Sequence, residues 1–180
     1  MSIEQAGGGN VNPNYGNGDE RYSKNCQACI GVFEARLRGY DIEALPYSKE
    51  THQFLEYHPE HMFIDPETKL VASFTYLDIQ NNKDLGSYLS KNINHGERYM
   101  LKFLPKQNDD SAHLVSIYKD NSGNIVFNDV MTGKVYGSEF MNTFSYKYGK
   151  SKFYPAIMRT DDKLLNIQRL NKVSKPSSKN

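Results

Sequence analysis

The sequence predicts an α+β fold, in which a helical first half is followed by a second half rich in β-strands. Apolar residues recur at the helical spacing between residues 25 and 39 and again between residues 84 and 93. The second half contains segments of strand composition, and a turn sequence joins two of them. We therefore expect an N-terminal helix that packs against a mainly antiparallel sheet.

The first helix is predicted to begin after Asn25, a residue type favoured at the N-cap, and to end near Gly39, which suits the left-handed position after a helix. Cys26 and Cys29, the two cysteines of the chain, then lie on the predicted buried side. A thiol in the first turn of a helix feels the positive end of the helix dipole, which favours the nucleophilic thiolate. Cys26 is the thiol nearest the helix start.

Short runs of β-branched, aromatic and alternating residues predict the strands. The segment from residue 40 to 46 and the segment from 74 to 77 are expected to be short extended pieces. The strands of the main sheet are expected at residues 98–104, 112–119, 125–130 and 154–159.

A hairpin fixes the register of two of these strands. The three-residue loop Asn121-Ser122-Gly123 places glycine at the left-handed position that such loops favour. With this loop Asp120 faces Asn124, and Ile117 faces Phe127. The same register sets Val115 opposite Asp129.

Two polar residues then share an apolar face of the predicted sheet. Because side chains alternate along a strand, His113 points to the same side as Asp129 and lies diagonally across from it. A carboxylate on an apolar face is costly to bury without a partner. We expect the His113 imidazole to be that partner.

Cys26, His113 and Asp129 together supply the groups that acyl transfer by a thiol needs. Cys26 attacks a carbonyl carbon, His113 accepts and returns the proton, and Asp129 holds the imidazole in the required tautomer. The backbone N–H of Cys26, with a side-chain donor from Asn25 or Gln27, is predicted to bind the oxyanion. A helix that carries Cys, followed by a sheet that carries His and then Asp, is the papain-type order.

At these residues the chain resembles the papain-fold toxin domains, the toxin glutamine deamidase family of bacterial polymorphic toxins and phage-head-associated proteins. The resemblance implies a papain-like fold and assigns the triad roles to Cys26, His113 and Asp129. Similar domains usually carry Gln where this chain has Met131. The matching stretches cover most of residues 12–162 and comprise residues 12–15, 25–29, 34–44, 111–113, 129–134 and 159–161.

The resemblance implies a cysteine-dependent amidohydrolase that deamidates a glutamine side chain on a protein of the target cell through a thioester intermediate. It also implies bacterial origin, delivery into the target cytoplasm as part of a larger secreted or phage-associated protein, and a cognate immunity protein. A cysteine protease toxin with the same triad is the closest alternative, because both reactions expel an amine from an acyl carbon.

Three other interpretations remain open. The Cys26-x-x-Cys29 pattern also occurs in thioredoxin-like oxidoreductases, but there it follows a buried strand, and here it follows a polar loop at residues 18–24. The domain is alternatively a non-catalytic binding module with a degenerate site. A zinc site on both thiols would need further ligands from His52, His58 or His61, and their spacing matches no standard pattern. We therefore assign no metal ligand and expect no cofactor.

The charged residues at the end of the first helix have two interpretations. Glu34, Arg36, Arg38 and Asp41 are most simply a solvated face with helix-ending charges. Alternatively, their recurrence in the family reflects an Arg–carboxylate pair that locks the helix to the next segment.

Length, composition and charge limit which partners and which domain organisation we expect. The 180 residues carry a formal net charge of +1, without a basic stripe, which argues against a nucleic-acid partner. No apolar stretch is long enough to span a membrane. We expect a flexible, Gly- and Asn-rich linker at residues 1–20, one papain-like domain at 21–170 and a disordered tail at 171–180. The sequence leaves the oligomeric state open.

Overall fold

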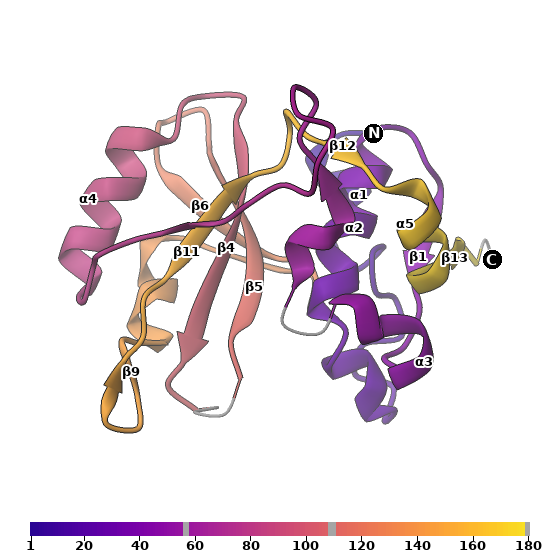
Figure 1. Cartoon of the computed structure of the whole chain (residues 1–180), viewed down its shortest axis with the longest axis horizontal. Helices are drawn as coiled ribbons and strands as arrows, with labels where there is room; N and C mark the ends of the chain where they lie inside the picture. The colour runs from indigo at the N-terminus through magenta and orange to yellow at the C-terminus, as the bar shows by residue number, and fades with distance from the viewer. Residues whose placement is uncertain (56–57, 108–110, 179–180) are drawn as a thin grey trace. The chain divides into compact units, whose positions relative to one another are not determined.

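The computed structural model describes residues 1–55, 58–107 and 111–178, and it mixes helices with antiparallel strands (Figure 1). The α+β prediction is confirmed. The chain forms two compact units, whereas one domain was expected across residues 21–170. The first unit comprises Met1–Ser73, Asp129–Lys134 and Asp162–Asn180, and the second comprises Phe74–Asn128 and Val135–Asp161.

The first unit is mainly helical, with two small antiparallel strand pairs. Strand β1 (Ile42–Ala44) pairs with β13 (Ser174–Pro176), and β2 (Phe63–Ile64) pairs with β12 (Leu164–Leu165). Its helices are α1 (Ile3–Ala6), α2 (Cys26–Leu37), α3 (Lys49–His52) and α5 (Ile167–Val173), with 3-10 turns η1 (Glu20–Ser23), η2 (Gln53–Leu55) and η3 (Pro59–Met62).

Helix α2 has the predicted bounds. It ends in a Schellman motif, in which the N–H of Gly39 donates to Arg36 O at 3.0 Å and the N–H of Tyr40 donates to Ala35 O at 3.1 Å. Gly39 has φ +100°, the left-handed conformation that this motif requires. The sequence pattern predicted one buried side, whereas every residue from Ala28 to Arg36 is buried.

The charge cluster at the end of α2 is not a solvated face, because Glu34 and Arg36 are buried. Arg36 donates to the backbone carbonyls of three residues at 2.8 to 3.1 Å, in the N-terminal segment and in β1, and to Ser177 Oγ at 3.0 Å. Its guanidinium also lies 3.6 Å from Asp41. The structure therefore agrees with the second interpretation, in which an Arg–carboxylate pair locks the helix to the next segment.

Both terminal segments are more structured than expected. Residues 1–20 were predicted to be flexible, yet they include α1, and the buried residues Ala6 and Val11 lie in this segment. Residues 171–178 were predicted to be disordered, yet they complete α5 and form β13, while residues 179–180 lie outside the described part. The physical reason is Arg36, whose buried guanidinium takes hydrogen-bond acceptors from both segments.

The second unit is a sheet covered on one face by helix α4 (Asn82–Asn92). The strands run in the order β3-β11-β4-β5-β6-β7, and β8 also pairs with β4. Leucine side chains of α4 share one hydrophobic core with residues of β4, β5 and β6. The strands are β3 (Thr75–Tyr76), β4 (Arg98–Pro105), β5 (His113–Lys119), β6 (Ile125–Asp129), β7 (Lys134–Tyr136), β8 (Phe144–Ser145), β9 (Lys147–Tyr148), β10 (Ser151–Lys152) and β11 (Ala156–Arg159), and η4 (Ser138–Thr143) lies between β7 and β8.

The predicted hairpin register is confirmed between β5 and β6. Ile117 faces Phe127, and the N–H of Asp120 donates to Asn124 O at 2.9 Å. Gly123 has φ +83°, as the three-residue loop requires. This register aligns His113, Val115 and Ile117 on the core face of β5.

Candidate thiol site

Cys26 is the first residue of α2, and its side chain is half-buried. Cys29 is fully buried one turn later. Burial raises the pKa of the Cys29 thiol well above its usual value, and the neighbouring Asp129 carboxylate acts in the same direction. Cys29 is therefore a neutral thiol near pH 7, and Cys26 is the accessible sulfur.

Asn25 occupies the N-cap position of α2, but its side chain makes no capping hydrogen bond. Both amide hydrogens are used elsewhere, because Nδ2 donates to Asn12 Oδ1 and to Leu45 O, each at 3.0 Å. The Asn25 Oδ1 atom accepts from the Cys29 thiol at 3.6 Å. The predicted role of Asn25 as an oxyanion donor is therefore wrong, since no amide hydrogen is left to donate.

Asn12 is a site residue to which the sequence analysis gave no role. Its side chain is buried, and Nδ2 donates to Tyr22 O at 2.8 Å, to Met131 O at 3.0 Å and to Asn25 Oδ1 at 3.2 Å. Together with the bond that Asn12 accepts from Asn25, this forms a reciprocal amide pair. The pair ties the start of α2 to the turn after β6. The one sequence signal was the matching stretch at residues 12–15.

Asp129 begins a tight turn that belongs to the same unit as α2. Its Oδ1 accepts from the N–H of Met131 at 3.2 Å and from the N–H of Thr132 at 3.4 Å. Gly133 closes the turn with φ +79°, and a Cβ there would lie 2.7 Å from the backbone nitrogen of Gly9. The carboxylate is thus held by the backbone of a turn that packs closely on the N-terminal segment.

His113 belongs to the second unit, as the first residue of β5. It pairs in register with Phe103 of β4, and the two rings meet edge to face with centroids 5.7 Å apart. Cys26 and Asp129 belong to the first unit. The approach of His113 to Cys26 and to Asp129 therefore stays a prediction. The oxyanion role of Gln27, the half-buried second residue of α2, also stays a prediction.

The zinc alternative that uses both thiols gains no support from the geometry. Among the residues that the structure describes, the one group with three metal-ligating side chains close together contains His58, Glu60 and His61, and it contains neither cysteine. His52 is buried, and its Nδ1 lies 2.7 Å from Thr51 Oγ1. Burial lowers the pKa of His52 to about 4.

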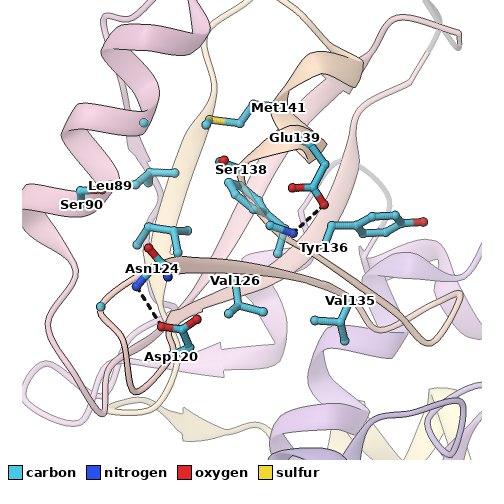
Figure 2. Close-up of a pocket in the computed structure, with 15 residues that line it drawn as sticks. Leu89, Ser90, Asp120, Asn124, Val126, Val135, Tyr136, Ser138, Glu139 and Met141 are labelled. Atoms are coloured by element: carbon cyan, nitrogen blue, oxygen red, sulfur yellow. Dashed lines mark hydrogen bonds between the residues drawn. The ribbon is translucent and has the colours of Figure 1, made fainter.

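A cavity of about 520 Å³ lies in the second unit, bounded by α4, β6 and η4 (Figure 2). Its carboxylates are held by backbone N–H groups, since Gly137 N donates to Glu139 at 2.9 Å and Asn124 N donates to Asp120 at 2.9 Å. None of the predicted catalytic residues lines it. The cavity is a feature of the sheet unit and not of the thiol site.

A cavity of about 510 Å³ in the first unit is polar, and its charged groups are already paired. Arg36 lies beside Asp41, and Glu43 beside Lys175 at 3.1 Å. Burial raises the pKa of Glu43, but the N–H and the hydroxyl of Ser178, which both donate to its carboxylate, act with Lys175 to bring that pKa below its usual value. These interactions form a structural network around the C-terminal strand β13.

Comparisons with known proteins do not assign the chain to a family. No protein-family model matches the chain, and no curated protein matches its sequence. Within the described residues, no helix is long and apolar enough to cross a membrane. The papain-like fold and the family resemblance accordingly stay predictions.

Proposed function

We propose that the protein is a cysteine-dependent amidohydrolase, with Cys26 as nucleophile, His113 as base and Asp129 as the orienting carboxylate. The observation that carries the proposal is the contrast between the two thiols. Cys26 is partly accessible at the positive end of a buried helix, and Cys29 is enclosed and protonated. One sulfur is therefore suited to attack an acyl carbon.

The surroundings of Cys26 support this role, because they fix the start of α2. The amide pair of Asn12 and Asn25 holds the residue before the nucleophile, and the same Asn12 holds the turn that carries Asp129. A rigid nucleophile and a rigid orienting group are what acyl transfer requires. The first N–H groups of a helix lack intrahelical acceptors, so the N–H of Cys26 is the proposed oxyanion donor.

The proposed reaction is side-chain deamidation of a protein glutamine. The Cys26 thiolate adds to the amide carbon, and the imidazolium of His113 protonates the nitrogen, which leaves as ammonia. His113 then takes a proton from water, whose oxygen attacks the thioester. The products are glutamate and the free thiol.

The biological setting is proposed from the family resemblance alone. We propose a bacterial effector or toxin domain that is delivered into the target-cell cytoplasm and blocked by a cognate immunity protein. Its oligomeric state is left open.

The test is to express the full chain in a bacterial host beside the variants Cys26→Ala, Cys29→Ala and His113→Ala, and to examine host proteins by mass spectrometry. Deamidation replaces an amide nitrogen by oxygen and raises the mass of a modified peptide by about one dalton. We expect this change with the unaltered chain and with Cys29→Ala, and its loss with Cys26→Ala and His113→Ala. Cysteine-to-alanine changes at both sites give a matched pair.

The other outcomes separate the rival functions. Cleaved host proteins that depend on Cys26 and His113 would identify a protease that uses the same triad. Equal dependence on Cys26 and Cys29, with a measurable dithiol potential, would identify an oxidoreductase. Activity that persists in His113→Ala would contradict the proposed base.

A further inference from the structure

A short turn in the first unit brings two histidines and a glutamate together. His58 is the N-cap of η3, Pro59 is its first residue, and the N–H of His61 donates to His58 O at 3.0 Å. A 3-10 turn has about three residues per turn, so residues three positions apart lie on the same side. Pro59 fixes its own φ and so preorganises the turn. The sequence His-Pro-Glu-His thus places both imidazoles together by backbone geometry alone.

The side chains of this turn converge further. One ligand atom from each of His58, Glu60 and His61 lies within 4.8 Å of the others. The His58 Nδ1 atom is 3.1 Å from Glu60 Oε1, and the two imidazole rings are 5.0 Å apart at their centroids. His58 is exposed, and the other two are half-buried, so an ion from solvent has access.

We propose that His58, Glu60 and His61 bind a divalent transition metal, with Zn²⁺ as the representative ion. Two imidazole nitrogens and one carboxylate oxygen form a ligand set that Zn²⁺ accepts, and water would complete the coordination. Zinc–nitrogen bonds are about 2.0–2.1 Å, so the donors must draw together. The exposed His58 ring supplies this movement by rotating about its side-chain bonds. This proposal departs from the expectation of no metal and is independent of the proposed hydrolase function.

The position of the turn gives binding a structural consequence. Met62 ends η3 and packs against Gly31 of α2, where a Cβ would lie 2.6 Å from Met62 Cγ. A metal that crosslinks η3 would hold this contact and so stabilise the unit. Arg169 opposes binding in part, because its cationic side chain donates to His61 O at 3.3 Å. We therefore expect a site that binds Zn²⁺ reversibly.

The test is calorimetric titration of the EDTA-treated full chain with ZnCl₂ near pH 7, paired with thermal unfolding. We expect one Zn²⁺ per chain and a Tm that rises with the zinc concentration. His58→Ala and His61→Ala should each weaken zinc binding by about tenfold or more, because even the loss of a residue that only supports a metal ligand lowers metal affinity by this much. His95→Ala removes an exposed histidine outside the cluster and should bind as the unaltered chain does.

Two further variants decide between ligand sets. Glu60→Gln keeps the shape of the side chain and should also weaken binding, since a neutral amide is a poorer ligand. The double change Cys26→Ser and Cys29→Ser should leave binding intact. Circular dichroism of the zinc-free His58→Ala variant should match that of the unaltered chain, because His58 is exposed.

Three outcomes would overturn the proposal. They are the absence of zinc binding in the unaltered chain, binding by His58→Ala and His61→Ala as tight as that of the unaltered chain, and loss of binding in the cysteine variant. The last would move the metal to the thiols, and Co²⁺ substitution would then show a thiolate charge-transfer band.

Discussion

The two units are stabilised by different kinds of core. The second unit has an apolar core of aliphatic side chains around a group of four phenylalanines, in which the ring centroids of Phe103 and Phe144 are 4.0 Å apart and those of Phe127 and Phe140 are 5.6 Å apart. The first unit also has apolar residues, but it buries a set of polar and charged side chains that includes Asn12, Asn25, Glu34, Arg36, Glu43 and His52.

This difference affects how precisely each unit fixes the positions of its side chains. Apolar packing is non-directional, and a sheet core tolerates substitution if its volume is kept. Hydrogen bonds of buried polar groups are directional, and breaking one leaves an unsatisfied partner. The proposed nucleophile and the Asp129 turn lie in the unit with the directional core, which is where fixed geometry matters most.

The largest effect is expected from Phe127→Ala in the aromatic core. Phe127 is fully buried, so truncation leaves a cavity, and we expect a loss of about 4 kcal/mol in the free energy of unfolding, measured in urea. Tyr148→Ala, at an aromatic residue that is 51% exposed, should change it by less than about 0.5 kcal/mol. A loss at Phe127 no greater than at Tyr148 would show that the aromatic cluster does not support the second unit.

The next effect is expected from Arg36→Leu in the polar core. The change removes four hydrogen bonds and leaves buried carbonyls without donors, so we expect a loss of about 3 kcal/mol in the free energy of unfolding. Native-state hydrogen exchange should show the loss most strongly in β1 and in the terminal segments. Arg21→Leu is the matched control, since Arg21 pairs with Asp19 at the exposed surface. Comparable losses in the two variants would contradict a special role for the buried guanidinium.

The smallest effect concerns acid stability and His52. Its pKa is about 4 in the folded chain and about 6.5 when unfolded, so the unfolded state binds the proton more tightly. The contribution of neutral His52 to the free energy of unfolding is therefore fully present above about pH 6.5 and is lost as the pH falls toward 4. Between pH 7 and pH 5 the free energy of unfolding should fall by about 2 kcal/mol. Urea unfolding at the two pH values measures this difference, and His52→Gln should reduce it. His95→Gln, at an exposed histidine, should leave it unchanged, and an undiminished pH dependence in His52→Gln would exclude His52 as its source.

Local signals in the sequence were enough to predict where α2 ends and how the β5–β6 hairpin is formed. Gly39 ends α2 and Gly123 forms the hairpin loop because each position needs a left-handed backbone, a property that one residue and its neighbours decide. The register of β5 and β6 followed from the length of that loop. The position of Cys26 as the first residue of α2 also followed from a local signal, the N-cap residue Asn25.

Only the tertiary structure decided how the polar residues pair. Asn12 is 13 positions from Asn25 and 119 positions from Met131, and no periodicity relates either pair, so neither the amide pair at the start of α2 nor the loss of Asn25 as a donor could be predicted. The sequence left open whether Arg36 lies in solvent or pairs with a carboxylate, and it is buried because acceptors from both ends of the chain surround it. Backbone conformation is set by neighbours along the chain, whereas the partner of a buried polar group is set by whichever distant segment folds against it.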